Sequence, residues 1–331
     1  MSGKTLILGI ESTAHTFGVA IIDENFTVLA DERSTLDVPL GSGIHPQKAA
    51  EHHAQNACRL ITSALKKANI SPDKLSGIAY SAGPGLGPAL RVGATTARAL
   101  SLLFKKPIYA IHHAIGHIEL AIKLTKSTDP LVVLVSGGHT AITAFSDGKW
   151  RIYGETLDIT LGNLIDQFAR ELGLPFPGGP HVESLAKKSQ NYIPLPYTVK
   201  GNNVMYSGLL THVISLASKH KLEDLCYSLQ ETAFSMLVEA VERALVQLDK
   251  KEIVLTGGVA SNSRLQEMLS QMAEIHGVKV LVSPKKYNPD NGVQIAIVGL
   301  YLHKHNLSVP VEKAIVKQRW RLDEVDIPWR M

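Results

Sequence analysis

The chain of 331 residues contains little cysteine, no large excess of charge and no long apolar run. Its two cysteines, Cys58 and Cys226, lie far apart, which excludes a disulfide scaffold and a CxxC zinc ribbon and suits a reducing cytoplasm. No apolar run approaches the roughly 20 residues of a membrane span. The start, Met-Ser-Gly-Lys, leads directly into a strand pattern without signal-peptide architecture. We therefore expect a cytoplasmic protein that makes no contact with a membrane.

The charges nearly balance, because 34 lysines and arginines face 30 aspartates and glutamates for a formal net charge of +4. Bulk charge therefore does not indicate a histone-like or basic-tail nucleic-acid binder. The length predicts about two domains. A chain of this size can bury a large core without disulfides or a structural metal.

The pattern of strands and helices occurs twice along the chain. Each half opens with an antiparallel meander and continues with alternating helices and strands. In the first half the predicted strands are 5–10, 18–22, 28–31, 78–81 and 107–111, and the helices are 45–69, about 88–104 and 112–124. A polar linker follows at 125–130. In the second half the strands are 131–135, 140–145, 150–153, 251–255 and 278–282, and the helices are 162–173, 207–219, 222–248, 262–275 and 291–305. The repetition predicts two similar lobes with a cleft between them.

Small residues are concentrated in turns at the ends of predicted strands. The turns are 9–13, 83–87, 136–138 and 257–258, with a fifth at 177–180 between helices. Glycine lets the backbone approach a ligand, and amides at a strand-to-helix turn favour anions. None matches a P-loop, and no GxGxxG follows the first strand. Each could be only a turn, but together they predict a phosphate-bearing ligand in the cleft. Ser12, Thr13 and Ser136 could donate to its phosphate, and Asp166 and Glu183 could accept from its ribose or base.

His113 and His117 are four residues apart on a predicted helix, so one face can present both imidazoles to one metal ion. Such pairs also occur as ordinary surface or core histidines. Ala114 follows His113, so the HExxH general base of a zinc protease is missing. Asp290 is the best-placed third ligand, although it could instead cap the last helix. Two histidines and one carboxylate suit Fe(II) or Zn(II) and leave positions open for substrate.

The sequence gives less support for further metal ligands or for a catalytic serine or cysteine nucleophile. His45, His52, His53 and His139 are further candidates for which no partner can be named. There is no GxSxG, and neither cysteine has a recognisable histidine context. A metal-assisted in-line transfer is therefore favoured over covalent catalysis.

Ordered motifs along essentially the whole chain resemble one family closely. They are GIESTAHT from Gly9, GIHPQKAAEHH from Gly43, AGPGLGPALRVG from Ala82, HHAIGH from His112, VSGGHT from Val135, GETLDITLGNLIDQFARELGLPFPGGPHVE from Gly154, TGGVASN from Thr256 and PDNGVQIA from Pro289. The chain is similar to the universal tRNA threonylcarbamoyladenosine transferases, formerly called O-sialoglycoprotein endopeptidases. The tail VKQRWRLDEVDIPW resembles the archaeal and eukaryotic branch. In that branch the protein is the catalytic subunit of the KEOPS complex.

The resemblance implies an α/β protein with the actin-like, Hsp70-like and sugar-kinase-like ATPase fold, built from two βββαβα lobes. We expect an N-terminal lobe at 1–128 with a helical insertion at about 36–70. The C-terminal lobe at 129–331 would carry helical insertions at about 160–250, and the last helix and tail would pack back on the N-terminal lobe. The implied reaction moves a threonylcarbamoyl group from threonylcarbamoyl-AMP to N6 of the adenosine beside the anticodon in ANN-decoding tRNAs.

The resemblance also implies the residues of the site. One divalent metal, Fe(II) in preference to Zn(II), would be held by His113, His117 and Asp290. Glu11 stands where the family keeps an acidic residue near the phosphates. The implied catalytic residues are therefore Glu11 and the three metal ligands. The ATP or AMP moiety would be bound by Leu134, Val135, Ser136, Gly137, Gly138, Asp166, Gly179, Glu183 and Asn262. Leu134 replaces a tyrosine of many archaeal members, so a phenolic metal ligand is absent.

Expected partners are tRNA and the KEOPS subunits, namely a small atypical kinase, a small dimerising subunit and a kinase-binding subunit. The basic stretch 317–321 would contact the kinase. Leu60, Ile61 and Leu65 would either contact the dimerising subunit or pack in the core. The competing interpretation is a nucleotide-binding, actin-like ATPase scaffold that regulates a partner kinase. It does not explain His113, His117 and Asp290 together.

Overall fold

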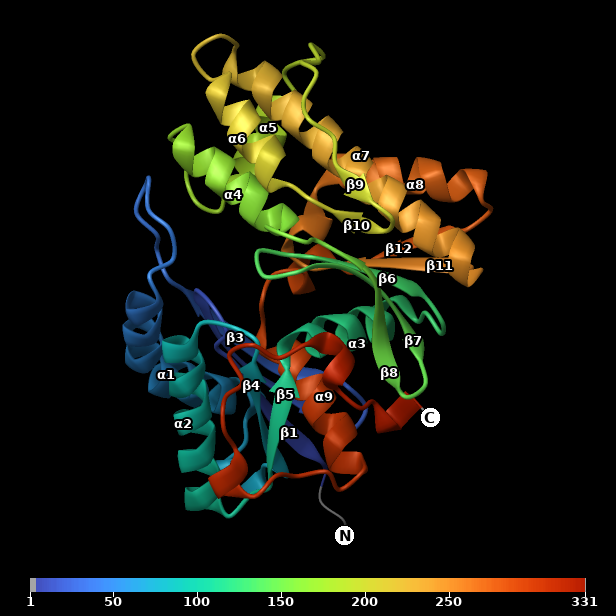
Figure 1. Ribbon diagram of the computed structural model, residues 1–331. Helices are drawn as coiled ribbons and strands as arrows, with labels where there is room; N and C mark the ends of the chain where they lie inside the picture. The colour runs from blue at the N-terminus through green and yellow to red at the C-terminus, as the bar shows by residue number, and fades with distance from the viewer. Residues whose placement is uncertain (1–3, 331) are drawn as a thin grey trace.

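The computed structural model describes residues 4–330 and contains two five-stranded sheets of the same topology (Figure 1). The first has the order β3-β2-β1-β4-β5 and comprises β1 (Leu6–Glu11), β2 (Thr16–Asp23), β3 (Val28–Thr35), β4 (Gly77–Gly83) and β5 (Ile108–His112). The second has the order β12-β11-β6-β7-β8 and comprises β6 (Leu131–Val135), β7 (Thr140–Ser146), β8 (Lys149–Glu155), β11 (Glu252–Thr256) and β12 (Lys279–Val282). In each, an antiparallel meander is extended by two parallel strands. The duplicated α/β fold predicted from the sequence is confirmed.

Helices surround both sheets. They are α1 (Pro46–Ala68), α2 (Gly87–Phe104), α3 (His113–Thr125), α4 (Leu161–Glu171), α5 (Gly178–Ala186), α6 (Ser207–Ser215), α7 (Leu222–Leu248), α8 (Ser263–Ile275) and α9 (Gly292–Lys304). Short 3₁₀ helices are η1 (Pro72–Lys74), η2 (Gly258–Ser261), η3 (Lys285–Tyr287), η4 (Val311–Lys313), η5 (Leu322–Glu324) and η6 (Pro328–Arg330). A small hairpin pairs β9 (Val199–Lys200) with β10 (Asn203–Val204). None of the helices within the described residues is long and apolar enough to cross a membrane.

Helix α5 is not predicted by the sequence pattern, because the Pro-Gly-Gly-Pro stretch at its start is typical of a turn. The helix begins at Gly178, whose amide donates a 2.8 Å hydrogen bond to the carboxylate of Asp166 on α4. It then packs against α4 and α7. Prolines near its start do not prevent a helix, since the first amides of a helix have no partner within it.

Helices α3 and α9 lie between the two sheets and pack against each other (Figure 1). Although α3 follows a strand of the first sheet, it contacts β6 and β11 of the second, whereas α9 crosses back to β1, β2 and β4. Helix α9 packs closely on β1: a Cβ added to Gly9 of β1 would lie only 2.4 Å from the amide nitrogen of Ala296 on α9. The start of α3 and the segment before α9 therefore meet where the two halves join.

The apolar side of α1 belongs to the core. Leu60 and Ile61 are buried in the cluster beneath the first sheet, and Leu65 packs against it. Of the two alternatives for these residues, core packing is confirmed. A partner that docks on α1 must use other side chains.

The chain after α9 touches both halves of the molecule. It first crosses the turn after β4, where the amide of Lys317 donates to the carbonyl of Ala82 (2.7 Å). Trp320 then packs on His112, whose Nε2 lies 3.1 Å from the Trp320 carbonyl oxygen. Farther on, the amide of Ile327 donates to the carbonyl of Gly148 in the second sheet (2.8 Å). The backbone of the tail thus links the two lobes, while the side chains of Lys317 and Arg321 stay exposed.

The tail ends in a buried ion pair, from which we predict a large loss of stability on substitution. Arg330 Nε lies 2.9 Å from Glu119 Oε1, which also accepts a 2.9 Å bond from Trp150 Nε1. Glu119 is fully buried in α3, so Arg330→Met leaves a buried carboxylate without its cation. We expect urea unfolding to show a loss of about 3 kcal/mol. Glu119→Gln combined with Arg330→Met should restore part of it. A loss below about 1 kcal/mol would show that the pair behaves as an exposed one.

Candidate active site

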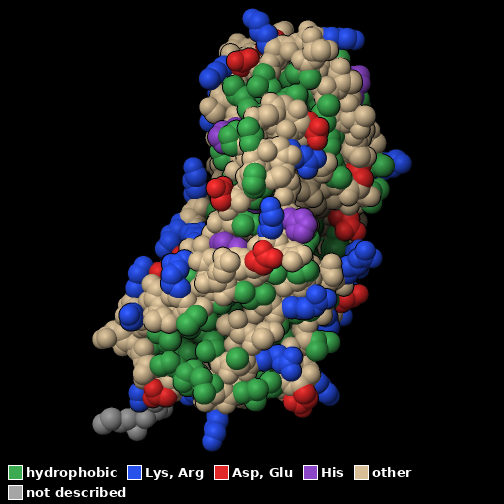
Figure 2. Space-filling model, turned by 90° about the vertical axis from the view of Figure 1, so that its left-hand side faces the viewer, with side chains coloured by type: hydrophobic (Ala, Val, Ile, Leu, Met, Phe, Trp, Pro, Cys, Tyr) green, Lys and Arg blue, Asp and Glu red, His purple; other side chains and the backbone are tan. Residues whose placement is uncertain are grey.

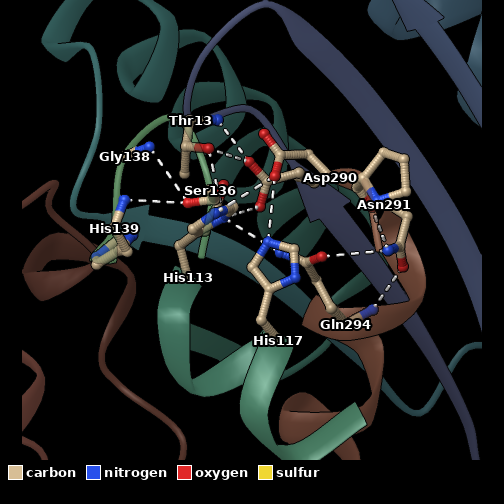
Figure 3. A network of polar contacts seen from close by, with 12 residues as sticks. Thr13, His113, His117, Ser136, Gly138, His139, Asp290, Asn291 and Gln294 are labelled. Carbon is tan, nitrogen blue, oxygen red and sulfur yellow. Dashed lines mark hydrogen bonds and ion pairs between the residues drawn. The ribbon is translucent and has the colours of Figure 1, made fainter. Parts of the chain in front are cut away.

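Three possible metal ligands converge where α3 and α9 begin (Figure 3). His113 and His117 lie one turn apart at the start of α3, and Asp290 precedes α9. His117 Nε2 is 3.2 Å and His113 Nε2 3.5 Å from Asp290 Oδ1. The ligand atoms of the three residues all lie within 4.8 Å of one another. Two imidazoles and a carboxylate at this spacing could hold one divalent cation.

Asp290 is free for this role because another residue caps α9. The side chain of Asn291 accepts the amide proton of Gln294 at 3.0 Å. The alternative assignment of Asp290 as the helix cap is therefore wrong. Its carboxylate instead faces the two histidines.

Glu11 lies on the other side of the His113 ring. Its buried carboxylate ends β1, and its Oε2 lies 2.9 Å from His113 Nδ1. The carboxylate is held in turn by the amide and the hydroxyl of Thr13, at 2.6 and 2.5 Å. If Nδ1 of His113 carries a proton and donates it to Glu11, Nε2 carries no proton. The free lone pair of Nε2 then faces Asp290. This is the arrangement in which a carboxylate orients a metal-binding histidine.

Two contacts around His113 were not predicted from the sequence. Gln294 Nε2 lies 3.2 Å from His113 Nδ1, and the ring of His139 is nearly parallel to that of His113 at 6.2 Å. His139 was a candidate without a partner, and the structure supplies one. Only the position of Gln294, one helical turn after Asp290, hinted at its contact.

The carboxylates control the charge of this group. Burial lowers the pKa of His113, but Glu11 and Asp290 more than offset burial and raise the pKa to about 9. Burial raises the pKa of Asp290, yet the histidines hold it well below its usual range. Burial also lowers the pKa of His117. The hydrogen bond to Asp290 acts in the opposite direction but does not offset burial. Without a metal, His113 therefore carries the positive charge of the group at neutral pH.

From this charge we predict that Zn(II) binding depends on pH. A metal-bound imidazole nitrogen carries no proton, so binding must displace the proton on His113. We expect Zn(II) affinity to rise about tenfold per pH unit between neutral pH and the pKa of about 9. Calorimetry in buffers of different ionisation enthalpy would count the proton released. An affinity that is constant over this interval would contradict the prediction.

The same raised pKa links pH to the stability of the metal-free protein. The pKa of His113 in the folded state lies above its ordinary value of 6.5. The contribution of the protonated ring to the free energy of unfolding is therefore complete below pH 6.5 and is lost as pH rises through about 9. Urea unfolding of metal-free protein across this range measures that loss.

The turn between β6 and β7 lies beside the histidines (Figure 3). Ser136 Oγ accepts from the amides of Gly138 (3.2 Å) and His139 (3.0 Å) and so shapes the turn. A Cβ on Gly137 or Gly138 would meet nothing within 4 Å, so a ligand can approach this backbone. Leu134 and Val135 are fully buried in β6, and they can contribute to a nucleotide site only through their backbone.

The remaining predicted nucleotide contacts gather around α5 and the start of α8. Asp166 is half-buried, which raises its pKa, and its carboxylate accepts the amide of Gly178, the first residue of α5, at 2.8 Å. Glu183 accepts from the amide of Ser263 at 3.0 Å, and Gly179 is open to a ligand. Asn262 caps α8 through its oxygen and donates to Gln230 Oε1 at 2.7 Å. The structure thus places Gly179 and Glu183 on α5, Asp166 on α4 beside the first residue of α5, and Asn262 at the cap of α8.

Fold and site together define a two-lobed protein of the actin-like ATPase fold with a possible metal group where its lobes join. The fold is shared with HypF of Thermococcus kodakarensis (TM-score 0.63, 14% identity, 92% of this chain and 48% of that chain). It is also shared with component A of the (R)-2-hydroxyglutaryl-CoA dehydratase of Acidaminococcus fermentans (TM-score 0.57, 17% identity, 92% and 99% of the chains).

Sequence comparison narrows this class to one family. The family model described as tRNA N6-adenosine threonylcarbamoyltransferase matches residues 27–297. Curated proteins of that name are 52% identical in Thermofilum pendens, over 98% of this chain and 97% of the relative, and 49% identical in T. kodakarensis, over 98% and 99%. The chain belongs to the tRNA N6-adenosine threonylcarbamoyltransferase family. It is an enzyme that transfers the threonylcarbamoyl group to N6 of adenosine in tRNA, as its motifs predicted.

Proposed function

We propose that the transfer takes place beside His113, His117 and Asp290, with an acyl adenylate, threonylcarbamoyl-AMP, as the donor. The observation that carries this proposal is the convergence of three metal-ligand atoms next to the open turn 136–138. A nucleotide bound at that turn would present its reactive carbonyl to the metal group. The adenosine part would extend toward Asp166, Gly179, Glu183 and Asn262.

The donor set fits one divalent cation, and we propose Fe(II), which the family resemblance favours over Zn(II). His113, His117 and Asp290 would hold it, and the single carboxylate leaves positions open. When bound, such an ion polarises a carbonyl and orients the group that it holds. Glu11 keeps the His113 ring in place through Nδ1. Backbone amides near the turn can stabilise charge on the phosphate, an effect worth roughly 3 kcal/mol per donor in other enzymes.

For the acceptor adenosine, the main contribution of the enzyme is to position N6 for attack on the carbonyl. An exocyclic adenine amine is a weak nucleophile, so its placement against the carbonyl matters more than the strength of a base. The adenosine, beside the anticodon of ANN-decoding tRNAs, must leave its stack to reach the junction of the lobes. A net charge of +4 suggests that the isolated chain holds tRNA weakly and with strong salt dependence.

We further propose that the enzyme works in the cytoplasm as the catalytic subunit of a KEOPS complex. Its lobes would span 1–128 and 129–331. The exposed charges of Lys317 and Arg321 remain available to the atypical kinase, although the backbone of the tail is already bound to the N-terminal lobe. The dimerising and kinase-binding subunits would complete the assembly.

An anaerobic assay with purified protein tests this function. Threonylcarbamoyl-AMP and unmodified tRNA are supplied with and without the other KEOPS subunits, and the modified nucleoside is quantified. We expect modification that is lost on chelation and returns with Fe(II). If the complete complex modifies tRNA from ATP-generated precursors but never from threonylcarbamoyl-AMP, the assignment of the donor is wrong.

A further inference from the structure

The turn 83–87, one of the glycine turns expected to bind phosphate, is occupied by the tail of the protein itself. A Cβ on Gly83 would overlap the carbonyl oxygen of Lys317. Two residues farther on, the amide of Gly85 donates a 3.2 Å hydrogen bond to the carbonyl of Gln318. Glycine is required at such a place because the backbone of another segment approaches closely. The position of the tail, and not that of a ligand, therefore accounts for the glycines of this turn.

The same turn also contacts the loop that supports His113. The amide of Leu86 donates to the carbonyl of Thr13 at 2.8 Å. The amide and the hydroxyl of Thr13 in turn donate to Glu11, whose Oε2 lies 2.9 Å from His113 Nδ1. The turn is thus held between the tail on one side and the loop after β1 on the other. Through these hydrogen bonds and its own backbone, it connects the tail with the ring of His113.

A second connection runs through the residue before His113. The indole of Trp320 meets the ring of His112 at 5.0 Å, and the Trp320 carbonyl oxygen lies 3.1 Å from His112 Nε2. A carbonyl oxygen can only accept, so Nε2 carries the proton and the bond fixes the orientation of the ring. His112 is the last residue before α3 and is buried, as are His113 and His117, whereas Figure 2 shows histidine side chains on the surface at the waist of the molecule. Trp320 therefore fixes the point at which α3 begins.

We propose that residues 317–320 are a positioning segment for His113, with Trp320 as its principal residue and the turn 83–87 as its docking site. This inference rests on the proposed function, because it takes His113 to be a metal ligand. The segment acts on His113 from two sides, through the preceding residue and through the carboxylate that bonds its ring. Farther along, the tail is hydrogen-bonded to the second sheet, so the segment is also anchored beyond these contacts.

The reaction makes the placement of His113 important. A shift of about 1 Å in a group that positions the reactants can lower a rate about 100-fold. A metal ligand must also meet its ion at a fixed distance and direction, which a helix start that moves cannot provide. The segment lies against the first lobe, whereas the turn 136–138, where the donor would bind, belongs to the second. We therefore expect its loss to lower metal affinity, and to lower kcat at saturating metal without changing the KM for threonylcarbamoyl-AMP.

Two substitutions of Trp320 in the full-length protein test the segment. Trp320→Ala removes the ring that packs on His112, whereas Trp320→Phe keeps an aromatic ring, and both keep the backbone carbonyl. We expect Trp320→Ala to weaken Zn(II) binding about tenfold, the lower end of the usual loss for a residue that orients a metal-binding histidine, and Trp320→Phe to retain most of the affinity. Competition against a zinc chelator measures it. Lys313→Ala, which changes an exposed residue earlier in the tail, should bind Zn(II) like the wild-type protein.

Two glycine substitutions test the docking site. Gly83→Ala pushes the Lys317 carbonyl away, so it should weaken Zn(II) binding as Trp320→Ala does. A Cβ on Gly87 would meet only the movable end of the Gln318 side chain, at 2.7 Å, so Gly87→Ala should leave the affinity unchanged. Calorimetry with AMP on metal-free protein separates the two roles of the turn. A docking site for the tail predicts unchanged AMP binding in both variants, and weaker AMP binding in both would overturn it in favour of a phosphate site.

Hydrogen exchange of the metal-free protein tests the positioning without zinc. Trp320→Ala should speed amide exchange at residues 83–87 and 112–117 and leave residues 131–135 of the second sheet unchanged. A lower free energy of unfolding with unchanged zinc affinity and unchanged exchange at 112–117 would show that Trp320 is only structural, and would overturn the inference. If the wild-type protein binds no zinc, the proposed metal group fails, and exchange at 112–117 alone decides whether the segment holds the start of α3.

Discussion

Replacing His113 and His117 together by alanine will abolish metal binding and reduce threonylcarbamoyl transfer by roughly a thousandfold or more, since a catalytic ion supplies several kcal/mol of transition-state stabilisation. The substitutions remove two of the three ligand atoms that lie within 4.8 Å of one another. Asp290 alone cannot hold a divalent cation against water. Metal analysis of the purified protein and a reconstituted transfer assay measure the two losses.

A matched control is available on the surface. His212→Ala with His220→Ala also removes two imidazoles, both exposed and distant in sequence from the metal group. This variant should bind metal and modify tRNA like the wild-type protein. If the His113, His117 variant keeps full transfer in the complete complex, the proposed metal mechanism is wrong.

Glu11→Gln will have the second-largest effect, although Glu11 lies behind His113 and not among the metal ligands. Glutamine can turn its amide N–H toward Nδ1 of His113, which favours a proton on Nε2, the nitrogen that faces Asp290. We expect metal affinity to fall about 10- to 100-fold, the loss that is usual when a residue that orients a metal-binding histidine is replaced. Competition against a zinc chelator measures the affinity. Transfer at limiting metal should fall in proportion and recover at saturating metal.

Glu119→Gln provides the matched control for this substitution. Glu119 is also a buried carboxylate, on the same helix as His113, but it pairs with Arg330 and Trp150. Its substitution should lower the free energy of unfolding and leave metal affinity unchanged. If Glu11→Gln destabilises the protein without weakening metal binding, Glu11 has only a structural role.

Local sequence was sufficient for much of the fold. Helix α7 and the strands of both meanders lie within a few residues of their predicted bounds, because hydrophobic periodicity and Gly–Pro punctuation are local signals. The helix α5 was missed for the same reason, since its start carries the residues that normally end a helix. The ordered motifs identified the family, and the sequence comparisons confirm it.

The spacing of His113 and His117 was enough to place both on one face of a helix, because four residues make about one helical turn. The sequence also placed Asp290 and the turn 136–138 in the candidate site through the family motifs. How these parts meet depends on the packing of the folded chain. Asp290 reaches the histidines because α3 and α9 cross between the sheets, and Asn291 takes the cap that Asp290 could have been. Glu11, Gln294 and His139 surround His113 from three separate segments. Such contacts depend on packing between distant parts of the chain, which no local pattern of residues specifies.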